Sequence, residues 1–276
     1  MDGWFLITGA TGGLGRAFCA ACARRGFRLF LTDRSEEALD TLAGGLRHAY
    51  GISVRTASCD LATDAGRDAL AEVVGHAGIR LSGMIHVAGI DAEGEFTSLS
   101  LGSLRAIMQV NMLSVAENIH QMLRFRQMDQ PFRIINVASL AAFQPMPYKA
   151  LYAATKRFLV QFSLGIREEL LTSGVSVTVL CPCGMPTTPV CIAEIEAQGI
   201  AGRLTTMNPG TVAEYTLDKA LRGKAIVVPG TLNRCVRFAS DLLPATWTAR
   251  WVRRQWSGAL MKRCGTLRSP ETGGAA

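Results

Sequence analysis

The start of the chain carries the feature that most constrains its fold, an apolar run that leads directly into a glycine-rich loop. Residues 3–8 read Gly-Trp-Phe-Leu-Ile-Thr, which is typical of a buried parallel strand. Gly9, Gly13 and Gly15 follow, and residues 16–25 are rich in alanine and favour a helix. A strand, a glycine loop and a helix in this order form the setting of a dinucleotide-binding fingerprint, in which backbone N–H groups approach a pyrophosphate. We therefore expect phosphate binding at this loop.

The end of the second expected strand bears on the choice of dinucleotide. Residues 28–32 are followed by Asp33 and Arg34. Asp33 lies close to the ~20 residues after the glycine loop at which an acidic residue accepts a hydrogen bond from a ribose 2′-hydroxyl. A carboxylate there repels a 2′-phosphate, so Asp33 favours NAD(H). The guanidinium of Arg34 would bind that phosphate, so NADP(H) stays an alternative. Asp33 also fits a plain acid near the N-terminus of the next helix, ahead of Ser35.

A tyrosine and a lysine four residues apart, Tyr152 and Lys156, indicate acid–base chemistry. On a helix these positions share one face, so the phenol and the ammonium reach the same point. A free phenol titrates near pH ~10, and a nearby cation favours the phenolate, which makes the tyrosine a better acid or base at neutral pH. Ser139, thirteen residues before the tyrosine, could hold a carbonyl or alcohol oxygen in line. Alone the pair is weak evidence, since a half-buried aromatic and a solvated lysine give the same spacing.

Together these motifs resemble the short-chain dehydrogenase/reductase family over roughly residues 3–230, and the glycine loop matches the family's Thr-Gly-x-x-x-Gly-x-Gly pattern. The resemblance implies a catalytic set of Asn111, Ser139, Tyr152 and Lys156. In it, Tyr152 is the general acid/base, and Lys156 lowers the tyrosine pKa and holds the nicotinamide ribose. Ser139 would hydrogen-bond the substrate oxygen, and Asn111 would position a water in a proton relay beside Lys156.

The resemblance also implies a set of cofactor contacts. Asp60 matches an aspartate near the adenine ring, and Thr187 would contact the nicotinamide carboxamide. Three positions depart from the family, because His86 and Val87 stand where two asparagines are usual and Cys183 stands where a glycine is usual. We interpret His86 as a structural substitute rather than a catalytic residue, and Cys183 as a narrowing of the loop beside the nicotinamide. The expected cofactor contacts are Gly9, Thr11, Gly13, Leu14, Gly15, Asp33, Arg34, Asp60, Leu61, Ala88, Gly89, Tyr152, Lys156, Pro182, Gly184 and Thr187.

Strands alternate with helical stretches along the chain, which predicts an α/β fold. We expect a Rossmann-type, doubly wound parallel sheet of about seven strands, with helices on both faces. At 276 residues and 49% apolar, the chain can bury one large core. We expect residues 1–230 to form the dinucleotide-binding and catalytic domain, 231–264 a basic amphipathic helical extension of it, and 265–276 a disordered tail. Further strands are expected at 84–87, 133–137, 175–180 and 225–228, and helices at 35–49, 64–76, 101–126 and 150–173.

Composition indicates the cellular compartment that we expect for the protein and whether we expect it to bind a metal. Uninterrupted apolar runs stay short of the ~18 residues of a membrane span, and the first strand starts too close to Met1 to leave room for a signal peptide. The eight cysteines are typical of reduced residues in a cytoplasmic protein. We expect no metal site, because Cys181 and Cys183 lack a second matching pair and the four histidines are scattered.

The positive charge is concentrated at the C-terminus. The chain has a net charge of +7, and residues 231–276 hold eight of the basic residues but only two acids, so the rest is close to neutral. This argues against a nucleic-acid-binding surface spread over the domain. Residues 232–262 read as two helical segments divided at Pro244, in which Trp247 and Trp251 interleave with arginines. They could pack over the substrate cleft or a subunit interface, sit peripherally on an anionic membrane, or bind a protein partner.

The sequence thus predicts an oxidoreductase that transfers hydride between NAD(H) and a secondary alcohol or ketone. Residues 186–210, which form the substrate loop in the family, are largely apolar and favour a bulky hydrophobic substrate such as a steroid, a bile acid or a lipid-like carbonyl. An NADPH-dependent 3-oxoacyl thioester reductase is the alternative, and a non-catalytic dinucleotide-sensing protein a weaker one. The resemblance further implies a homodimer or homotetramer, paired through the helices at 101–126 and 150–173.

Overall fold

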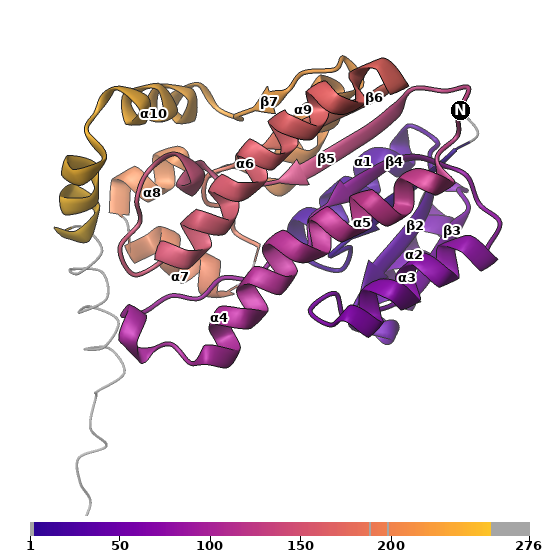
Figure 1. Ribbon diagram of the computed structural model, residues 1–276, viewed down its shortest axis with the longest axis horizontal. Coiled ribbons are helices and arrows are strands. Elements are labelled where there is room, and N and C mark those ends of the chain that lie inside the picture. Colours follow the sequence, from indigo (N-terminus) through magenta and orange to yellow (C-terminus); the bar gives the residue numbers. More distant parts are fainter. Residues whose placement is uncertain (1–2, 188, 198, 255–276) are drawn as a thin grey trace, which may run out of the picture.

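The structure is a computed structural model that describes residues 3–187, 189–197 and 199–254 (Figure 1). Its centre is a seven-stranded parallel sheet in the order β3-β2-β1-β4-β5-β6-β7, which confirms the doubly wound sheet predicted from the sequence. The strands are β1 (Trp4–Thr8), β2 (Arg28–Asp33), β3 (Val54–Ser58), β4 (Leu81–His86), β5 (Phe132–Val137), β6 (Val175–Leu180) and β7 (Ile226–Val227).

The strand order reverses between β1 and β4, and this reversal positions the site. The chain leaves β1 for β2 and β3 on one side, then returns to place β4 on the other side of β1. Thr8 at the end of β1 pairs with His86 at the end of β4, so the loops that follow both strands start level with each other. In open α/β sheets, ligands bind at such a switch point, outside the carboxyl ends of the strands.

Helices cover both faces of the sheet. One face packs against α1 (Gly13–Arg24), α2 (Glu36–Tyr50) and α9 (Pro209–Leu221). The other packs against α3 (Asp64–His76), α5 (Ser114–Met122) and α6 (Ala150–Leu170). The remaining helices are α4 (Leu101–Met108), α7 (Pro189–Ala197), α8 (Gly199–Thr205), α10 (Thr231–Leu242) and the helical residues 245–254, and the last four of these lie at one end of the molecule in Figure 1.

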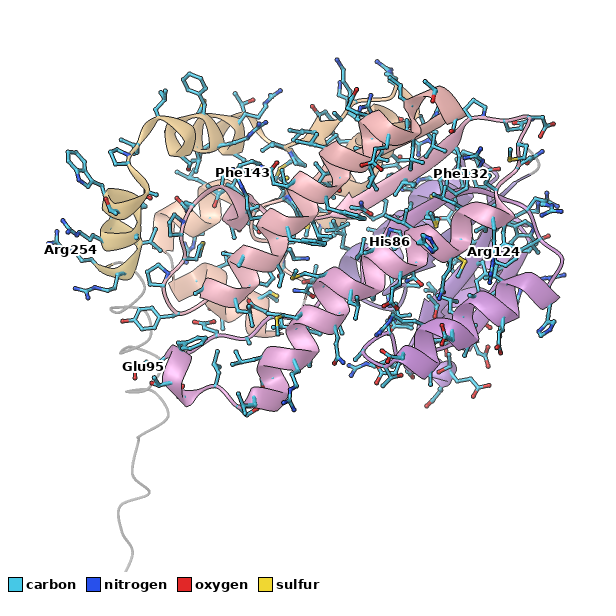
Figure 2. The ribbon with its side chains drawn as sticks, viewed as in Figure 1. His86, Glu95, Arg124, Phe132, Phe143 and Arg254 are labelled. Atoms are coloured by element: carbon cyan, nitrogen blue, oxygen red, sulfur yellow. The ribbon has the colours of Figure 1, made fainter. Side chains whose placement is uncertain are left out.

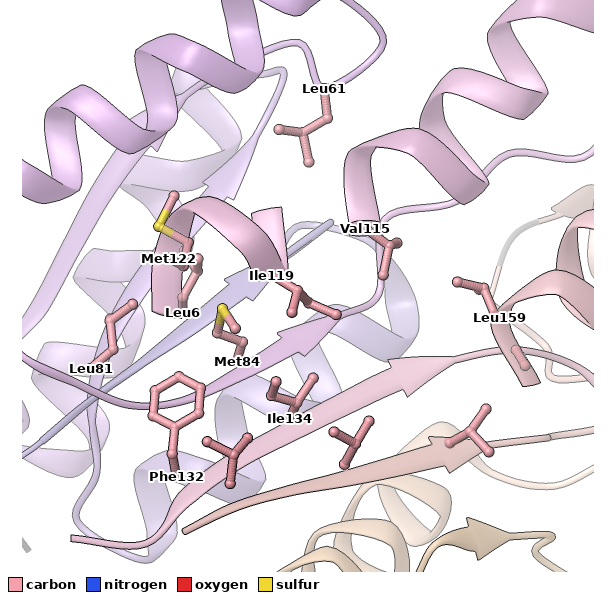
Figure 3. Close-up of a cluster of buried hydrophobic side chains, with 14 of the residues drawn as sticks. Leu6, Leu61, Leu81, Met84, Val115, Ile119, Met122, Phe132, Ile134 and Leu159 are labelled. Atoms are coloured by element: carbon pink, nitrogen blue, oxygen red, sulfur yellow. The ribbon is translucent and has the colours of Figure 1, made fainter. Parts of the chain in front are cut away.

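The sheet is buried on both faces, which explains why its strands read as unbroken apolar runs. Successive side chains of β1 point to opposite faces: Trp4 and Leu6 enter one hydrophobic cluster, and Phe5 and Ile7 enter the other. Figure 3 shows the first cluster, in which side chains of β4 and β5 meet those of α5 and α6. Both clusters extend to the strand ends, so the loops that form the site rest on a packed core.

Several expected elements differ from those observed. Strand β3 was not predicted, because its residues are partly polar and half-exposed at the sheet edge, and helix α9 was not predicted either. The expected helix 101–126 is interrupted by a π turn, η2 (Gln109–Leu113), between α4 and α5. The expected helix 150–173 ends at Leu170, where the 3-10 turn η5 (Leu171–Ser173) begins. The substrate loop 186–210 contains α7 and α8.

The C-terminal extension divides where the sequence predicts. Helix α10 ends at Leu242, Pro244 follows, and helical residues 245–254 come next. The rest of the expected extension and the expected tail 265–276 lie outside the described residues.

Candidate active site

The glycine loop fits closely against the loop that follows β4. Gly9 has a φ of +65°, and a Cβ there would lie 2.6 Å from the backbone nitrogen of Ala88. A Cβ on Gly15 would lie 2.0 Å from the Gly9 carbonyl oxygen. Only glycine fits at these two positions. Helix α1 then begins after Gly12, which provides no side-chain cap, so the first backbone N–H groups of the helix face a potential phosphate. Leu14, an expected contact, is buried in this first turn.

Asp33 fastens the glycine loop to the end of β2. One oxygen of its carboxylate accepts from the Thr11 backbone N–H at 2.9 Å and from the Thr11 hydroxyl at 2.6 Å. Its other oxygen accepts from the Arg34 N–H at 2.8 Å, while the Arg34 side chain is exposed. This structural role of Asp33 was not predicted from the sequence. Thr11, Asp33 and Arg34 are thus brought together, and their contacts with a dinucleotide remain a prediction.

Asp60 and Leu61 lie beside Asp33. The N–H of Cys59 donates to the Asp33 carbonyl at 2.9 Å, which sets the loop after β3 next to the end of β2. The Asp60 carboxylate accepts from the N–H of Ala62 at 3.0 Å. Leu61 is buried, and its carbonyl accepts from the fully buried Arg67 at 3.0 Å. The expected adenine end of the site is therefore one continuous rim at the ends of β2 and β3.

Tyr152 and Lys156 share one face of α6. The Lys156 Nζ lies 5.6 Å from the centre of the Tyr152 ring and donates to the Val137 carbonyl, at the end of β5, at 3.0 Å. Lys156 is only 5% exposed, and this burial lowers its pKa to about 8, although the negative charge of Asp91 acts in the opposite direction. At neutral pH the side chain is therefore still mostly a cation, held against the phenol.

Ser139 lies two residues beyond the end of β5. Its hydroxyl oxygen accepts from the Ala141 N–H at 3.1 Å and begins the 3-10 turn η4 (Leu140–Phe143). Accepting this bond leaves the hydroxyl hydrogen to donate elsewhere. The Leu140 N–H donates to the Pro182 carbonyl at 2.8 Å, which ties the serine loop to the segment after β6. Both segments leave the carboxyl ends of neighbouring strands, as a site at the sheet edge requires.

Asn111 lies in the π turn η2 and is fully buried. Its side-chain oxygen accepts from the Ile90 N–H at 2.9 Å, and its amide donates to the Ile90 carbonyl at 2.9 Å and to the Thr155 hydroxyl at 3.1 Å. The side chain thus joins the loop after β4 to α6. A Cβ on Gly89 would lie 3.2 Å from the Lys156 Nζ and 3.4 Å from the Asn111 Oδ1, so both residues meet at Gly89. A relay water at Asn111 remains a prediction.

The segment after β6 lies over the glycine loop. A Cβ on Gly13 would lie 2.8 Å from the Thr187 Cβ, so Thr187 covers the first turn of α1. A Cβ on Gly184 would lie 3.2 Å from Ile195 in α7, and the Gly184 carbonyl accepts from the Met207 N–H at 3.3 Å. The segment that holds the expected contacts Pro182, Gly184 and Thr187 therefore lies against the glycine loop. On another side of the loop, the Ala88 N–H donates to the Thr8 hydroxyl at 3.3 Å.

His86 bridges two strands below the site. Its Nδ1 lies 2.8 Å from the Asn136 Oδ1, and the Asn136 amide donates to the Ser163 hydroxyl at 2.9 Å. Because the amide nitrogen is used in this way, the Asn136 oxygen is the acceptor and His86 Nδ1 carries the hydrogen. Burial lowers the His86 pKa to about 4, so the ring is neutral. The bond links β4 to β5, as expected of a structural substitute; the sequence analysis missed Asn136 and Ser163, although a buried strand asparagine is a signal in itself.

A set of contacts just before α6 was also not predicted from the sequence. Lys149, only 5% exposed, precedes α6 and donates to the Asp91 carboxylate at 2.6 Å, with Glu93 at 3.4 Å. Tyr148 has a φ of 68°, and its carbonyl accepts from the Gly94 N–H at 2.9 Å. These contacts hold the loop after β4 against the start of the helix that carries Tyr152.

Within residues 3–187, 189–197 and 199–254, no three His, Cys, Asp or Glu side chains are grouped to hold a metal ion. Cys181 and Cys183 are free thiols, and burial raises the Cys181 pKa to about 12. Among the helices of the described residues, none combines the length and apolar character that a bilayer span requires.

Known proteins of similar sequence or fold are dehydrogenases and reductases. A family model described as short chain dehydrogenase matches residues 4–197. The 7beta-hydroxysteroid dehydrogenase of Collinsella aerofaciens is 28% identical over 236 residues, which cover 84% of this chain and 87% of that protein. The very-long-chain 3-oxoacyl-CoA reductase-B of Danio rerio is 28% identical over 269 residues, which cover 92% of this chain and 84% of the relative. A solved 7beta-hydroxysteroid dehydrogenase structure matches the fold with a TM-score of 0.82 at 24% identity, over 91% of this chain and 96% of that one.

Proposed function

Because the chain belongs to the short-chain dehydrogenase family, an NAD(P)-dependent class of oxidoreductases acting on CH–OH groups, we propose that it interconverts a secondary alcohol and a ketone on a bulky hydrophobic substrate. The observation that carries the proposal is the Tyr152–Lys156 pair, on one face of α6 with the lysine buried beside the end of β5. A non-catalytic sensing role has no feature of the site in its favour.

A nicotinamide dinucleotide fits the residues present. The glycine loop has no room for side chains at Gly9 and Gly15, and the first turn of α1 presents uncapped N–H groups at the switch point of the sheet. When bound, the dinucleotide supplies or accepts the hydride. Thr11 and Asp33 hold the loop in shape on the adenine side, and Thr187 covers it on the other.

The protein's own residues manage the proton. In the reducing direction, the Tyr152 hydroxyl donates a proton to the substrate oxygen, and in the oxidising direction the phenolate removes it. The Lys156 ammonium favours the phenolate and so lowers the barrier to the proton's departure. Ser139 holds the substrate oxygen by a hydrogen bond that strengthens as negative charge develops there. Asn111 acts through Ile90 and Thr155 and keeps the loop and α6 in register.

Substitution of Tyr152 by phenylalanine tests this assignment. Tyr152→Phe removes the proton donor but keeps the ring, so turnover should fall by at least about a thousandfold while NADH binding, measured by fluorescence titration, persists. The matched control is Tyr215→Phe on α9, which leaves the site untouched. Near-normal turnover of Tyr152→Phe would overturn the role of this residue.

Substrate class and cofactor preference are further parts of the proposal. The apolar character of residues 186–210 and the similarity to a 7beta-hydroxysteroid dehydrogenase support a steroid-like or bile-acid-like substrate. The similarity to a very-long-chain 3-oxoacyl-CoA reductase keeps a 3-oxoacyl thioester as second candidate. A screen of NADH and NADPH oxidation over ketosteroids, bile acids and acyl thioesters separates them. We favour NAD(H), since Asp33 would lie near a 2′-phosphate, and NADPH turnover that depends on Arg34 would contradict this.

We further propose self-association through the helices beside the site. An apolar groove of about 330 Å³ runs between η2 and α6, and Met108 and Leu113 at its edge are 41% and 42% exposed. It is lined by Arg105, Met108, Gln109, Met112, Leu113, Ala116 and Phe158. A homodimer or homotetramer would bury it, and light scattering after size exclusion checks this. The free cysteines of the described residues fit a reducing compartment, so we keep the cytoplasm as the proposed location.

A further inference from the structure

The two C-terminal helices expose an apolar surface that the rest of the described fold does not cover. We call this surface the outer face. Its members are between 45% and 68% exposed: Leu232, Phe238, Leu242, Leu243, Trp247 and Trp251. Large apolar side chains gathered in this way mark an interaction surface more often than they occur on an ordinary solvated helix.

The opposite side of the same helices is already packed. The Asn233 amide donates to the Thr205 and Pro229 carbonyls at 3.2 and 2.9 Å, and Val236 packs against the core. Thr248 and Val252 are buried in the second helix. Arg237 lies with its guanidinium 4.8 Å from the Phe143 ring centre, and Phe143 is labelled below α10 in Figure 2. The extension is therefore anchored by its inner side, and the outer face points away from the domain.

Helical spacing groups four members of the outer face. Phe238 and Leu242 are four residues apart and share one side of α10, and Trp247 and Trp251 have the same spacing in the second helix, while Leu243 lies between the two helices. Pro244 separates the two helices, so the apolar stripes meet at an angle at this residue. The two tryptophans lie toward the C-terminal end of the surface.

Charge decides what covers the outer face. Residues 231–254 contain five arginines and one aspartate, and Arg234, Arg250 and Arg253 are exposed. A symmetric contact between two copies places the same patch against itself, so it would bring two sets of these arginines together. An anionic lipid surface has the complementary charge instead. Tryptophan and arginine around an apolar stripe are also the composition that favours the boundary between headgroups and acyl chains.

We propose that the outer face of the C-terminal helices docks on the surface of an anionic phospholipid bilayer. The apolar side chains enter the headgroup boundary, and the arginines bind the phosphates of anionic lipids. Helices α7 and α8 lie at the same end of the molecule, so docking holds the mouth of the site near the bilayer (Figure 1). The attachment is peripheral and reversible.

Vesicle sedimentation of the full chain tests the proposal. The protein should sediment with vesicles of equimolar phosphatidylcholine and phosphatidylglycerol, and at least tenfold less with phosphatidylcholine alone. Raising the salt to about 1 M should release it, because the screening length falls to about 3 Å. Vesicles with brominated acyl chains should quench tryptophan emission. Trp4 is buried in the sheet, so the quenching reports on the C-terminal tryptophans.

Matched variants assign the binding to the outer face. Arg250→Gln with Arg253→Gln should weaken binding to anionic vesicles about thirtyfold, since each basic residue near such a surface contributes roughly fivefold and the two contributions multiply. The control pair, Arg80→Gln with Arg222→Gln, removes two exposed charges elsewhere and should bind as the wild type does.

The aromatic side chains are tested in the same way. Trp247→Ser with Trp251→Ser should weaken vesicle binding at least tenfold. The control pair, Leu171→Ser with Met128→Ser, removes exposed apolar side chains far from the C-terminal helices and should leave vesicle binding unchanged. Absence of sedimentation, equal binding to both vesicle types, or equal losses in target and control variants overturns the proposal. The proposal is also overturned if light scattering shows a dimer for the wild type and a monomer for the variant Trp247→Ser with Trp251→Ser, because the outer face would then bind a second copy.

Discussion

Replacing Lys156 by methionine separates what its charge does for the reaction from what that charge costs the fold. Burial lowers the Lys156 pKa from 10.5 to about 8, which corresponds to a free-energy cost of about 3 kcal/mol for keeping the ammonium inside the folded protein. The unfolded chain carries this proton up to pH 10.5, whereas the folded protein releases it near pH 8. Between these values the unfolded state binds more protons, so the stability of the wild type rises with pH in this window, and the full cost is present below it.

The methionine variant lacks this dependence. It also loses the hydrogen bond to Val137, but that loss is nearly independent of pH. The difference in unfolding free energy, variant minus wild type, should therefore fall by about 2 kcal/mol between pH 7 and pH 9.5. The variant should have no measurable turnover at any pH, because the phenol of Tyr152 has lost its cation.

Urea unfolding at a series of pH values measures the effect. The urea titrations of both proteins are carried out in the absence of dinucleotide. The control is Lys224→Met, which removes an exposed lysine and should leave the pH dependence of the unfolding free energy unchanged. A difference between Lys156→Met and the wild type that stays constant from pH 7 to pH 9.5 would refute the argument. It would mean that Lys156 keeps its ordinary pKa in the folded protein.

Further predictions concern neighbouring groups. His86 is neutral in the folded protein down to about pH 4, so stability should fall as the pH drops from 6.5 to 4, and His86→Asn should remove up to about 3 kcal/mol of that loss, measured by urea unfolding. Lys149→Met strands a partly buried carboxylate at Asp91 and should lower the unfolding free energy by about 1–3 kcal/mol, with partial recovery when Asp91→Asn is added. Leu113→Asp should shift the protein toward monomer in light scattering; an unchanged mass would place the contact elsewhere.

The parts of the site that the sequence predicted are those with local signals. The glycine loop and the Tyr152–Lys156 pair depend on short spacings, and a strand or a helix converts such spacings directly into geometry. Strand β3 was not predicted because it lies at the sheet edge, where exposed residues such as Arg55 interrupt the apolar run. The π turn around Asn111 also has no local sequence signal, since it depends on what α4 and α5 pack against.

The contacts that sequence reasoning missed join distant segments. Lys149 and Asp91 are 58 residues apart, and His86 and Asn136 are 50 apart. Neither pair has a spacing rule, because the sheet order that brings them together is a property of the whole fold. Asp33 shows a related limit: its type and position predicted a ligand contact, but its carboxylate also holds Thr11 in the loop.

The reversal of strand order between β1 and β4 has a consequence for how the protein comes apart. The sheet consists of two blocks, β1–β3 with α1 and α2, and β4–β7 with α5 and α6, which meet along the β1–β4 pairing. A dinucleotide bound at the carboxyl ends of these strands would touch the first block through the glycine loop and the second through Lys156 and Thr187. It would therefore act as a cross-link between them, and amide exchange at the β1–β4 seam should slow on binding more than exchange at β3 or β7.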